Sequence, residues 1–236
     1  MKKNLVSVVA LCLAVIAIIM CSICCLKKSN CVESVLRERP ELVIEAMQNY
    51  EIKMREEAMM QSQKLIEDSL NDINNNPRSP VLGNPNGSIV VVEFFDYSCG
   101  YCHRLYPTMK NIIAKNPDVK FVAKELGFLS PMSLYAARAT QAANMQGKYA
   151  EMHAALFAIE GRLTEQTIEA AAQKIGLDMA KFRTDIESAE VMSIVQENST
   201  LAQKINVNGV PTLIINGKMV QSIDEAEIQR VIESFR

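Results

Sequence analysis

The chain has 236 residues, of which 49% are hydrophobic, so it is long enough for one compact domain with additional segments. Its formal net charge of −2 provides no basic surface, which argues against nucleic acid as a partner. Thirteen methionines and no tryptophan favour adaptable helix packing over a rigid aromatic binding groove.

The N-terminus carries an apolar run over residues 5–26, preceded by Lys2 and Lys3 and followed by Lys27. About twenty apolar residues are enough to cross a bilayer. No small-x-small cleavage pattern follows, so an uncleaved signal-anchor is favoured over a cleaved signal peptide. Lipidation is disfavoured because no small residue precedes the cysteines of the run. We assign residues 1–28 to a signal peptide or signal-anchor, and either one sends the rest of the chain out of the cytoplasm.

The next segment, residues 34–73, lacks glycine and repeats apolar side chains at three- and four-residue steps. This spacing predicts a long amphipathic helix. A second copy of the chain is the simplest partner for its apolar stripe, and the alternatives are a helix that folds back on its own domain or one that is frayed and acts as a spacer. We assign residues 29–76 to a helical segment that forms a homo-oligomer through residues 34–73. The stripe consists of Val43, Met47, Tyr50, Met54, Ala58, Leu65, Ile66, Leu70 and Ile73.

An Asn- and Pro-rich linker at residues 74–80 introduces the C-terminal domain, residues 77–236. β-branched and aromatic runs predict strands, and Ala-rich periodic runs divided by glycines predict three to five helices in an insert at about 129–204. The whole pattern predicts an α/β domain that contains a βαβ unit. The elements expected outside the insert are a strand at 89–95, a helix at 103–115, a strand at 119–125, a strand at 210–215, an Asn216-Gly217 hairpin turn, a return strand at 218–223 and a helix capped by Asp224.

Cysteine placement is the first indication of chemistry. Five of the seven cysteines precede residue 32, and only Cys99 and Cys102 lie in the C-terminal domain. A C-x-x-C pair between a strand and a helix places its first sulfur at the helix N-terminus, where free N–H groups and the helix dipole stabilise a thiolate. The pattern predicts that Cys99 attacks and Cys102 resolves a mixed disulfide. Gly100, Tyr101 and His103 are expected to tune the redox properties.

The C-x-x-C motif has three alternative interpretations. A zinc site normally needs a second ligand pair, and the C-terminal domain offers only His103 and His153 as such ligands. The sequence from Cys99 to His103 also fits the C-x-x-C-H signature of c-type haem attachment, but the buried strand in front of it argues against haem. An inert structural disulfide is the third alternative. We expect no metal and no other cofactor, and we interpret His153 as a structural histidine.

Two further residues are expected near the dithiol. Pro211 begins a strand, and a cis bond after Val210 would turn the Val210 backbone towards the cysteines and a substrate; an ordinary trans proline is the alternative. Glu93 is an acid in an apolar strand, where an unpaired charge costs several kcal/mol, so it should be tuned or used. It could pass protons to Cys102, or it could be an edge carboxylate that reaches solvent.

The run from Val91 to His103 (VVEFFDYSCGYCH), the helical insert and Val210-Pro211-Thr212 resemble the DsbA family of periplasmic disulfide oxidoreductases, in particular its Com1-like and ScsC-like branch with an N-terminal helical extension. The resemblance implies a thioredoxin fold interrupted by a helical domain. It also implies that Cys99 and Cys102 are the redox pair, Pro211 the cis proline that faces them, and Glu93 the buried acid beneath them.

By this resemblance, the protein oxidises or isomerises cysteines of exported proteins in the periplasm, or at the outer face of the membrane, of a Gram-negative bacterium. A DsbB-like oxidase or a DsbD-like reductase would be its membrane redox partner. Gly100-Tyr101 is the dipeptide of DsbC-type isomerases, whereas Val210 resembles the oxidases, so the direction of electron flow stays open. The alternatives are a chaperone or binding module of thioredoxin fold and an electron carrier with c-type haem.

Overall fold

A computed structural model of the chain describes residues 15–16, 18–20, 34–220 and 222–236. The chain divides into two compact units, residues 1–59 and 60–236, each considered by itself. Most of the predicted signal or anchor segment, residues 1–28, lies outside the described residues. Within the described ranges, no helix is both long and apolar enough to cross a bilayer. Membrane anchoring therefore stays a prediction.

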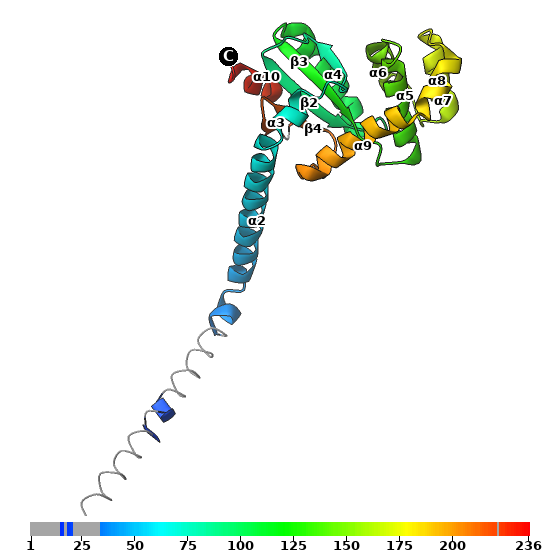
Figure 1. Cartoon of the computed structure of the whole chain (residues 1–236). Helices are drawn as coiled ribbons and strands as arrows, with labels where there is room; N and C mark the ends of the chain where they lie inside the picture. The colour runs from blue at the N-terminus through cyan, green and yellow to red at the C-terminus, as the bar shows by residue number, and fades with distance from the viewer. Residues whose placement is uncertain (1–14, 17, 21–33, 221) are drawn as a thin grey trace, which may run out of the picture. The chain divides into compact units, whose positions relative to one another are not determined.

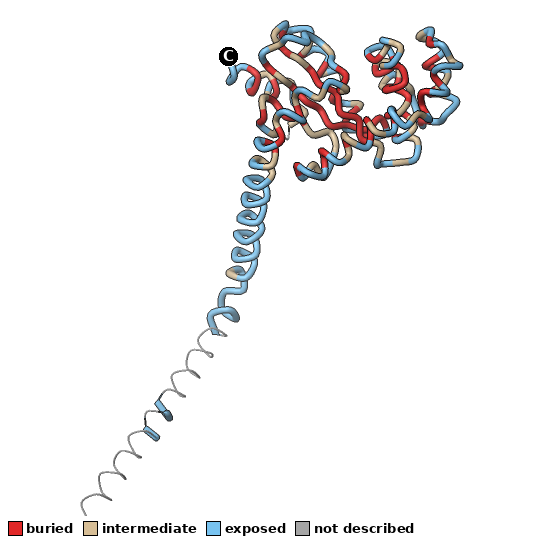
Figure 2. Tube along the Cα trace, in the orientation of Figure 1, coloured by how far each residue is buried: buried red, intermediate tan, exposed pale blue. Residues whose placement is uncertain are grey.

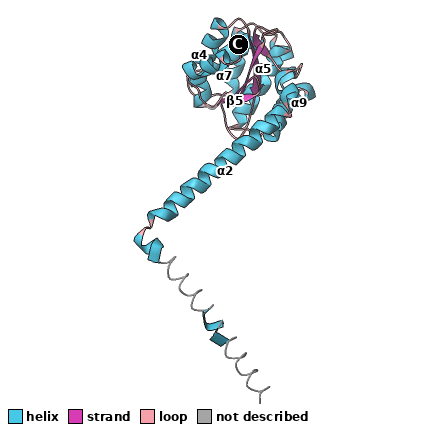
Figure 3. Ribbon diagram, turned by 90° about the vertical axis from the view of Figure 1, so that its left-hand side faces the viewer, coloured by secondary structure: helices cyan, strands magenta, loops and turns pink. Residues whose placement is uncertain are grey.

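The predicted helix at 34–73 is interrupted. Its main part is α2 (Glu41–Glu67), drawn as one long helix in Figure 3, and a separate short helix, α3 (Leu70–Asn74), follows in the chain. Residues 34–38 form a helical turn that ends before Pro40, because a proline disfavours the helical conformation of the residue before it. The first part of the apolar stripe, which includes Met47 and Tyr50, is exposed along α2 (Figure 2).

The last part of the stripe is covered by the chain's own domain. Ile66 at the end of α2 and Ile73 in α3 are fully buried. They belong to one apolar cluster with Val92, Phe94 and Ile214 of the sheet. This part of the apolar stripe is therefore covered by folding back on the chain's own domain, which was one of the alternatives.

The described part of the chain forms one five-stranded sheet in the order β1-β3-β2-β4-β5. β2 and β3 run parallel, which confirms the predicted βαβ unit, and the other pairs are antiparallel. The edge strand β1 was not predicted, because three residues between two turn signals show no period. The strands are β1 (Val81–Gly83), β2 (Ile89–Phe95), β3 (Val119–Glu125), β4 (Thr212–Ile215) and β5 (Lys218–Val220).

Helices cover both faces of the sheet (Figure 1). The α4 (Gly100–Lys115) and α10 (Glu225–Glu233) side chains pack on the face that carries Val91 and Phe95. The α3 and α9 side chains pack on the face that carries Val92 and Phe94. Successive side chains of β2 therefore point to opposite faces of the sheet, and both faces are buried. The sheet thus forms the middle layer of three.

The insert between β3 and β4 is helical in the described residues, as predicted. Its helices are α5 (Pro131–Asn144), α6 (Tyr149–Phe157), α7 (Glu165–Lys174), α8 (Met179–Ile186) and α9 (Ala189–Lys204). Side chains at their N-caps accept backbone hydrogen bonds in α5, α7, α8 and α9, which explains where these helices begin. Figure 1 shows α5 to α8 grouped beyond one end of the sheet, on the side where α4 begins.

Candidate active site

The two cysteines of the motif open helix α4. β2 ends at Phe95, and Cys99 is the N-cap of α4, with its Sγ accepting a hydrogen bond from the Cys102 N–H at 3.4 Å. Both are free thiols in this structure. Cys99 is 6% exposed and Cys102 is fully buried, so only Cys99 presents any surface to a reaction partner.

The start of β4 lies beside Cys99, although 111 residues separate Val210 from it in sequence. The Val210–Pro211 peptide bond is cis. The Cys99 thiol donates to the Val210 carbonyl oxygen, with 3.4 Å between sulfur and oxygen. Sheet topology causes this approach: β4 runs antiparallel to β2 with Thr212 opposite Phe94, so the beginning of β4 meets the end of β2.

Glu93 is buried in β2, with 4% of its surface exposed, and lies opposite Ala123 and Leu213 in the sheet. The interpretation as an edge carboxylate that reaches solvent is therefore wrong. Burial raises the pKa of Glu93 to about 8. Burial is also the main cause of the raised pKa of the Cys102 thiol, and the Glu93 charge adds to it. The two groups therefore influence each other's protonation.

The three predicted tuning residues have different surroundings. Gly100 is exposed, and a Cβ added to it would meet no atom within 4 Å. The Tyr101 ring is 58% exposed and lies 4.1 Å from the Arg104 guanidinium carbon. His103 makes a 2.8 Å hydrogen bond between Nε2 and the Tyr97 carbonyl oxygen. Among the three, only His103 is tied by its side chain to the loop in front of the cysteines.

Asp96 is a functional candidate that the sequence analysis missed. Its fully buried carboxylate accepts backbone hydrogen bonds from Ser98 at 2.8 Å, Phe128 at 3.2 Å and Leu129 at 3.1 Å. It therefore holds the loop before Cys99 against the loop that leads into the insert. The available signal was an Asp directly after a strand and two residues before a Ser, a pattern in which the side chain bonds the backbone two residues on.

A second buried acid was also missed. Glu125 ends β3 and accepts hydrogen bonds from the Tyr149 hydroxyl, from Gln141 Nε2 at 2.8 Å and from Thr140 Oγ1 at 3.4 Å. Burial raises its pKa, while the Tyr149 and Gln141 bonds and the Lys124 charge oppose the rise. The donors belong to α5 and α6, so Glu125 connects the sheet to the insert.

His153 of α6 is buried in an aromatic cluster that joins the insert to Phe95, Tyr97 and Tyr106. Its Nδ1 makes a 2.8 Å hydrogen bond with the Tyr97 hydroxyl, and burial lowers its pKa to about 3. The imidazole is therefore neutral, which agrees with its interpretation as a structural histidine. Its contact with Tyr97, two residues before Cys99, was not visible in the sequence because the two residues are 56 positions apart.

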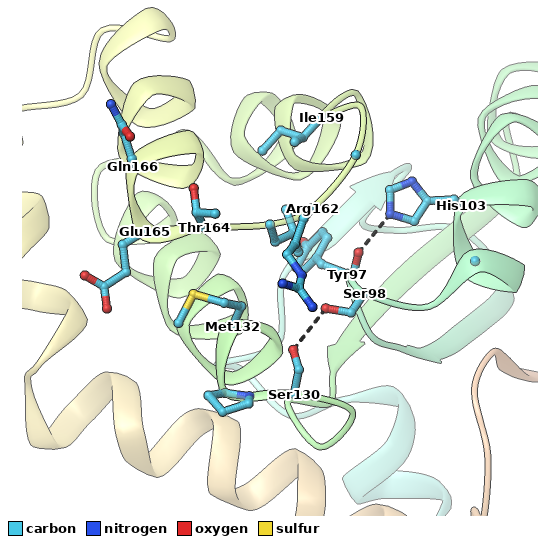
Figure 4. Close-up of a pocket in the computed structure, with 14 residues that line it drawn as sticks. Tyr97, Ser98, His103, Ser130, Met132, Ile159, Arg162, Thr164, Glu165 and Gln166 are labelled. Atoms are coloured by element: carbon cyan, nitrogen blue, oxygen red, sulfur yellow. Dashed lines mark hydrogen bonds between the residues drawn. The ribbon is translucent and has the colours of Figure 1, made fainter.

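A pocket of about 1000 Å³ opens next to the dithiol (Figure 4). Its wall on the side of the sheet includes Tyr97, Gly100 and His103, and its wall on the side of the insert includes Met132 and Ile159. Sequence reasoning gave no indication of it, because its two walls come from elements that are distant in the chain.

A family model described as thioredoxin matches residues 75–234, more than half of the chain. The chain belongs to the thioredoxin family. This confirms the predicted thioredoxin-like α/β fold. Curated relatives of this thioredoxin domain include "Na(+)/H(+) antiporter NhaA 1" of Mycobacterium sp. (strain KMS), 31% identical over 165 residues. The match covers 67% of this chain and 27% of that relative, so the chain spans about a quarter of its length.

Solved structures with the same fold include a thioredoxin-like oxidoreductase from Silicibacter pomeroyi DSS-3, 35% identical, with a TM-score of 0.68 and coverage of 70% of this chain and 96% of that one. Salmonella enterica Typhimurium BcfH is 26% identical, with a TM-score of 0.73 and coverage of 88% and 93%. A linker-deleted Proteus mirabilis ScsC is 22% identical, with a TM-score of 0.72 and coverage of 84% and 93%. The resemblance to DsbA-like and ScsC-like proteins is thus confirmed at the level of the fold.

Proposed function

We propose that this protein is a thiol–disulfide oxidoreductase that oxidises or isomerises cysteines of exported proteins through Cys99 and Cys102. One observation carries the proposal: Cys99, the more accessible cysteine, lies at a helix N-terminus and within 3.4 Å of the Val210 carbonyl in front of a cis proline. The similarity to a thioredoxin-like oxidoreductase of Silicibacter pomeroyi supports it.

In the oxidising direction, a substrate thiolate attacks Cys99 Sγ of the oxidised pair. The Cys99–Cys102 bond breaks, and its electron pair stays on Cys102 sulfur, which takes up a proton because its buried thiol has a raised pKa. A second substrate thiolate then attacks the substrate sulfur of the mixed disulfide, and Cys99 leaves as a thiolate. The substrate loses two electrons, and the pair gains them. Isomerisation starts from the reduced pair, with Cys99 attacking a substrate disulfide.

Glu93 would serve as the proton acceptor and donor of Cys102. Its support is a buried carboxyl with a pKa of about 8, coupled electrostatically to Cys102. A group with such a pKa can exchange a proton near neutral pH, where an ordinary glutamate is already ionised. Val210 and Pro211 would hold the substrate backbone, and Gly100, Tyr101 and His103 would set the redox potential.

We place the protein in the periplasm or at the outer membrane face of a Gram-negative bacterium, with a DsbB-like oxidase or a DsbD-like reductase as its partner. The apolar N-terminal run supports export. The exposed stripe on α2, including Met47, Tyr50 and Met54, supports homo-oligomerisation. Deletion of residues 34–59 should reduce the number of chains per particle, as measured by the mass in solution. An unchanged number of chains would contradict oligomerisation through this part of the segment.

The redox state of the pair in intact cells tests the function and gives its direction. Cells are quenched with acid, and free thiols are labelled with a reagent that adds mass. A pair that is mostly oxidised indicates an oxidase, and a pair that is mostly reduced indicates an isomerase. Purified protein should also catalyse exchange between a dithiol and a protein disulfide, and Cys99→Ser should abolish it. Full activity in Cys99→Ser would disprove the proposal.

A further inference from the structure

The pocket beside the dithiol has an apolar floor. Tyr97 and Leu163 are buried in it, and the half-buried Met132 and Ile159 approach from the insert (Figure 4). Its volume of about 1000 Å³ lies at the upper end of the range of ligand sites in proteins. The pocket is therefore large enough to take more than one side chain.

The charges at the pocket do not favour a charged ligand. Arg162 and Glu165 both line it and both are exposed, so the rim carries one charge of each sign. Ser98 and Ser130 bond to each other through their hydroxyls at 3.3 Å. An uncharged apolar side chain fits this combination of apolar floor and polar rim, because it gains buried contact area and leaves no charge unpaired.

The pocket lies beside the reactive cysteine, because Ser98 and Gly100, on either side of Cys99, line it while Cys99 itself does not. The space at Gly100 is open, since a Cβ added there would meet no other side chain within 4 Å. Val210 does not line it, so the pocket and the Val210 carbonyl are separate contacts for a chain bonded to Cys99. An extended chain advances at most about 3.3–3.6 Å per residue, so residues close to the bonded cysteine are the ones that reach the pocket.

We propose that this pocket is a specificity subsite, which binds an apolar side chain of the substrate polypeptide within about three residues of the cysteine that bonds to Cys99. The inference rests on the proposed thiol–disulfide exchange and adds its substrate class: cysteines flanked by apolar residues. A folded partner with only polar residues near its cysteine would react without this contact.

The test uses the full chain with Cys102→Ser, in which Cys99 forms a mixed disulfide that is not resolved. Two synthetic peptides carry one cysteine each as a disulfide with thionitrobenzoate; one has Leu and Phe next to the cysteine, the other Ser and Gly. Cys99 attacks the peptide sulfur, the bond to thionitrobenzoate breaks, and its thiolate leaves and is measured by absorbance. The chain with both Cys99→Ser and Cys102→Ser gives the background from the N-terminal cysteines.

We expect the apolar peptide to react about tenfold faster than the polar one. Met132→Ser should reduce this ratio towards one, and Met132→Leu should keep it. Leu134→Ser is the matched control, because Leu134 lies on the same helix, is 41% exposed and does not line the pocket; it should keep the ratio. A ratio near one in the parent chain, or an unchanged ratio in Met132→Ser, would overturn the subsite. If the Cys102→Ser chain reacts with both peptides only as fast as the chain that lacks both cysteines, the proposed function itself is overturned.

Discussion

Glu93 on β2 and Glu125 on β3 are both buried acids of the central sheet, but their surroundings differ. Glu125 has hydrogen-bond donors from Tyr149, Gln141 and Thr140. For Glu93 among the described residues, burial raises the pKa to about 8, with no opposing hydrogen bond or positive charge. Glu125 is thus held by donors from the insert, whereas Glu93 can change its protonation near pH 8.

The largest expected effect concerns the pH dependence of stability at Glu93. The pKa of Glu93 is raised from 4.5 to about 8 in the folded state. The contribution of this side chain to the free energy of unfolding is therefore fully present below pH 4.5 and is lost as the pH rises from there through 8. Above pH 8 the folded protein has to hold a buried carboxylate. Glu93→Gln should therefore exceed the wild type in free energy of unfolding by about 4 kcal/mol at pH 9, and by less than about 1 kcal/mol at pH 5.

Urea unfolding at both pH values measures this difference. Lys124, whose pKa is lowered to about 8, titrates in both proteins and therefore cancels in the comparison. A difference between Glu93→Gln and the wild type that is the same at pH 5 and pH 9 would contradict the assigned pKa.

The next effect concerns Glu125. Glu125→Leu removes the acceptor of Tyr149 and Gln141 and leaves their donors buried, which should reduce the free energy of unfolding by about 3 kcal/mol. Glu93→Leu serves as the matched control at pH 6 and should cost less, because no donor in the described part of the chain bonds to the Glu93 side chain. Equal losses in the two variants would remove the distinction between the two acids.

A kinetic effect of about a hundredfold is expected if Glu93 moves the proton of Cys102. Glu93→Gln should prolong the lifetime of the mixed disulfide between Cys99 and a peptide, as followed by acid quenching and mass spectrometry. Glu125→Gln is the control and should leave the lifetime at the wild-type value. An unchanged lifetime in Glu93→Gln would leave Glu93 with a structural role only.

The smallest effect concerns the buried hydrogen bond between Tyr97 and His153. Tyr97→Phe removes the hydroxyl that bonds to His153 Nδ1 at 2.8 Å. A loss of about 1 kcal/mol in the free energy of unfolding is expected. The measurement is urea unfolding at neutral pH, where His153 is uncharged, and an unchanged midpoint would show that this bond adds nothing to stability.

Much of the fold was predictable because the signals were local. The apolar run at 89–95, the Asn216-Gly217 turn and the cap at Asp224 each specify an element within a few residues. The interruption of the 34–73 helix before Pro40 was less visible, since a proline is also compatible with the first turn of a helix. The edge strand β1 depends on pairing with β3, and a three-residue segment carries no sign of that pairing.

The candidate site was predictable only in part. Cys99 and Cys102 are adjacent in a recognisable motif, and Pro211 was associated with them by the order of two motifs in the chain. Asp96 and Glu125 were not found, because their roles depend on donors that come from the insert or from the loop leading into it. The pocket could not be predicted from the sequence for the same reason.

The sequence by itself determined the elements, the position of the dithiol at the start of a helix and the presence of an acid in an apolar strand. Only the tertiary structure decided that the Val210 carbonyl lies next to Cys99, that Glu93 is removed from water while Glu125 is given donors, and that the insert forms a pocket wall. The physical reason is range: local conformation and helix capping depend on neighbours in the chain, whereas burial, pKa and pocket shape depend on which distant segments the sheet brings together.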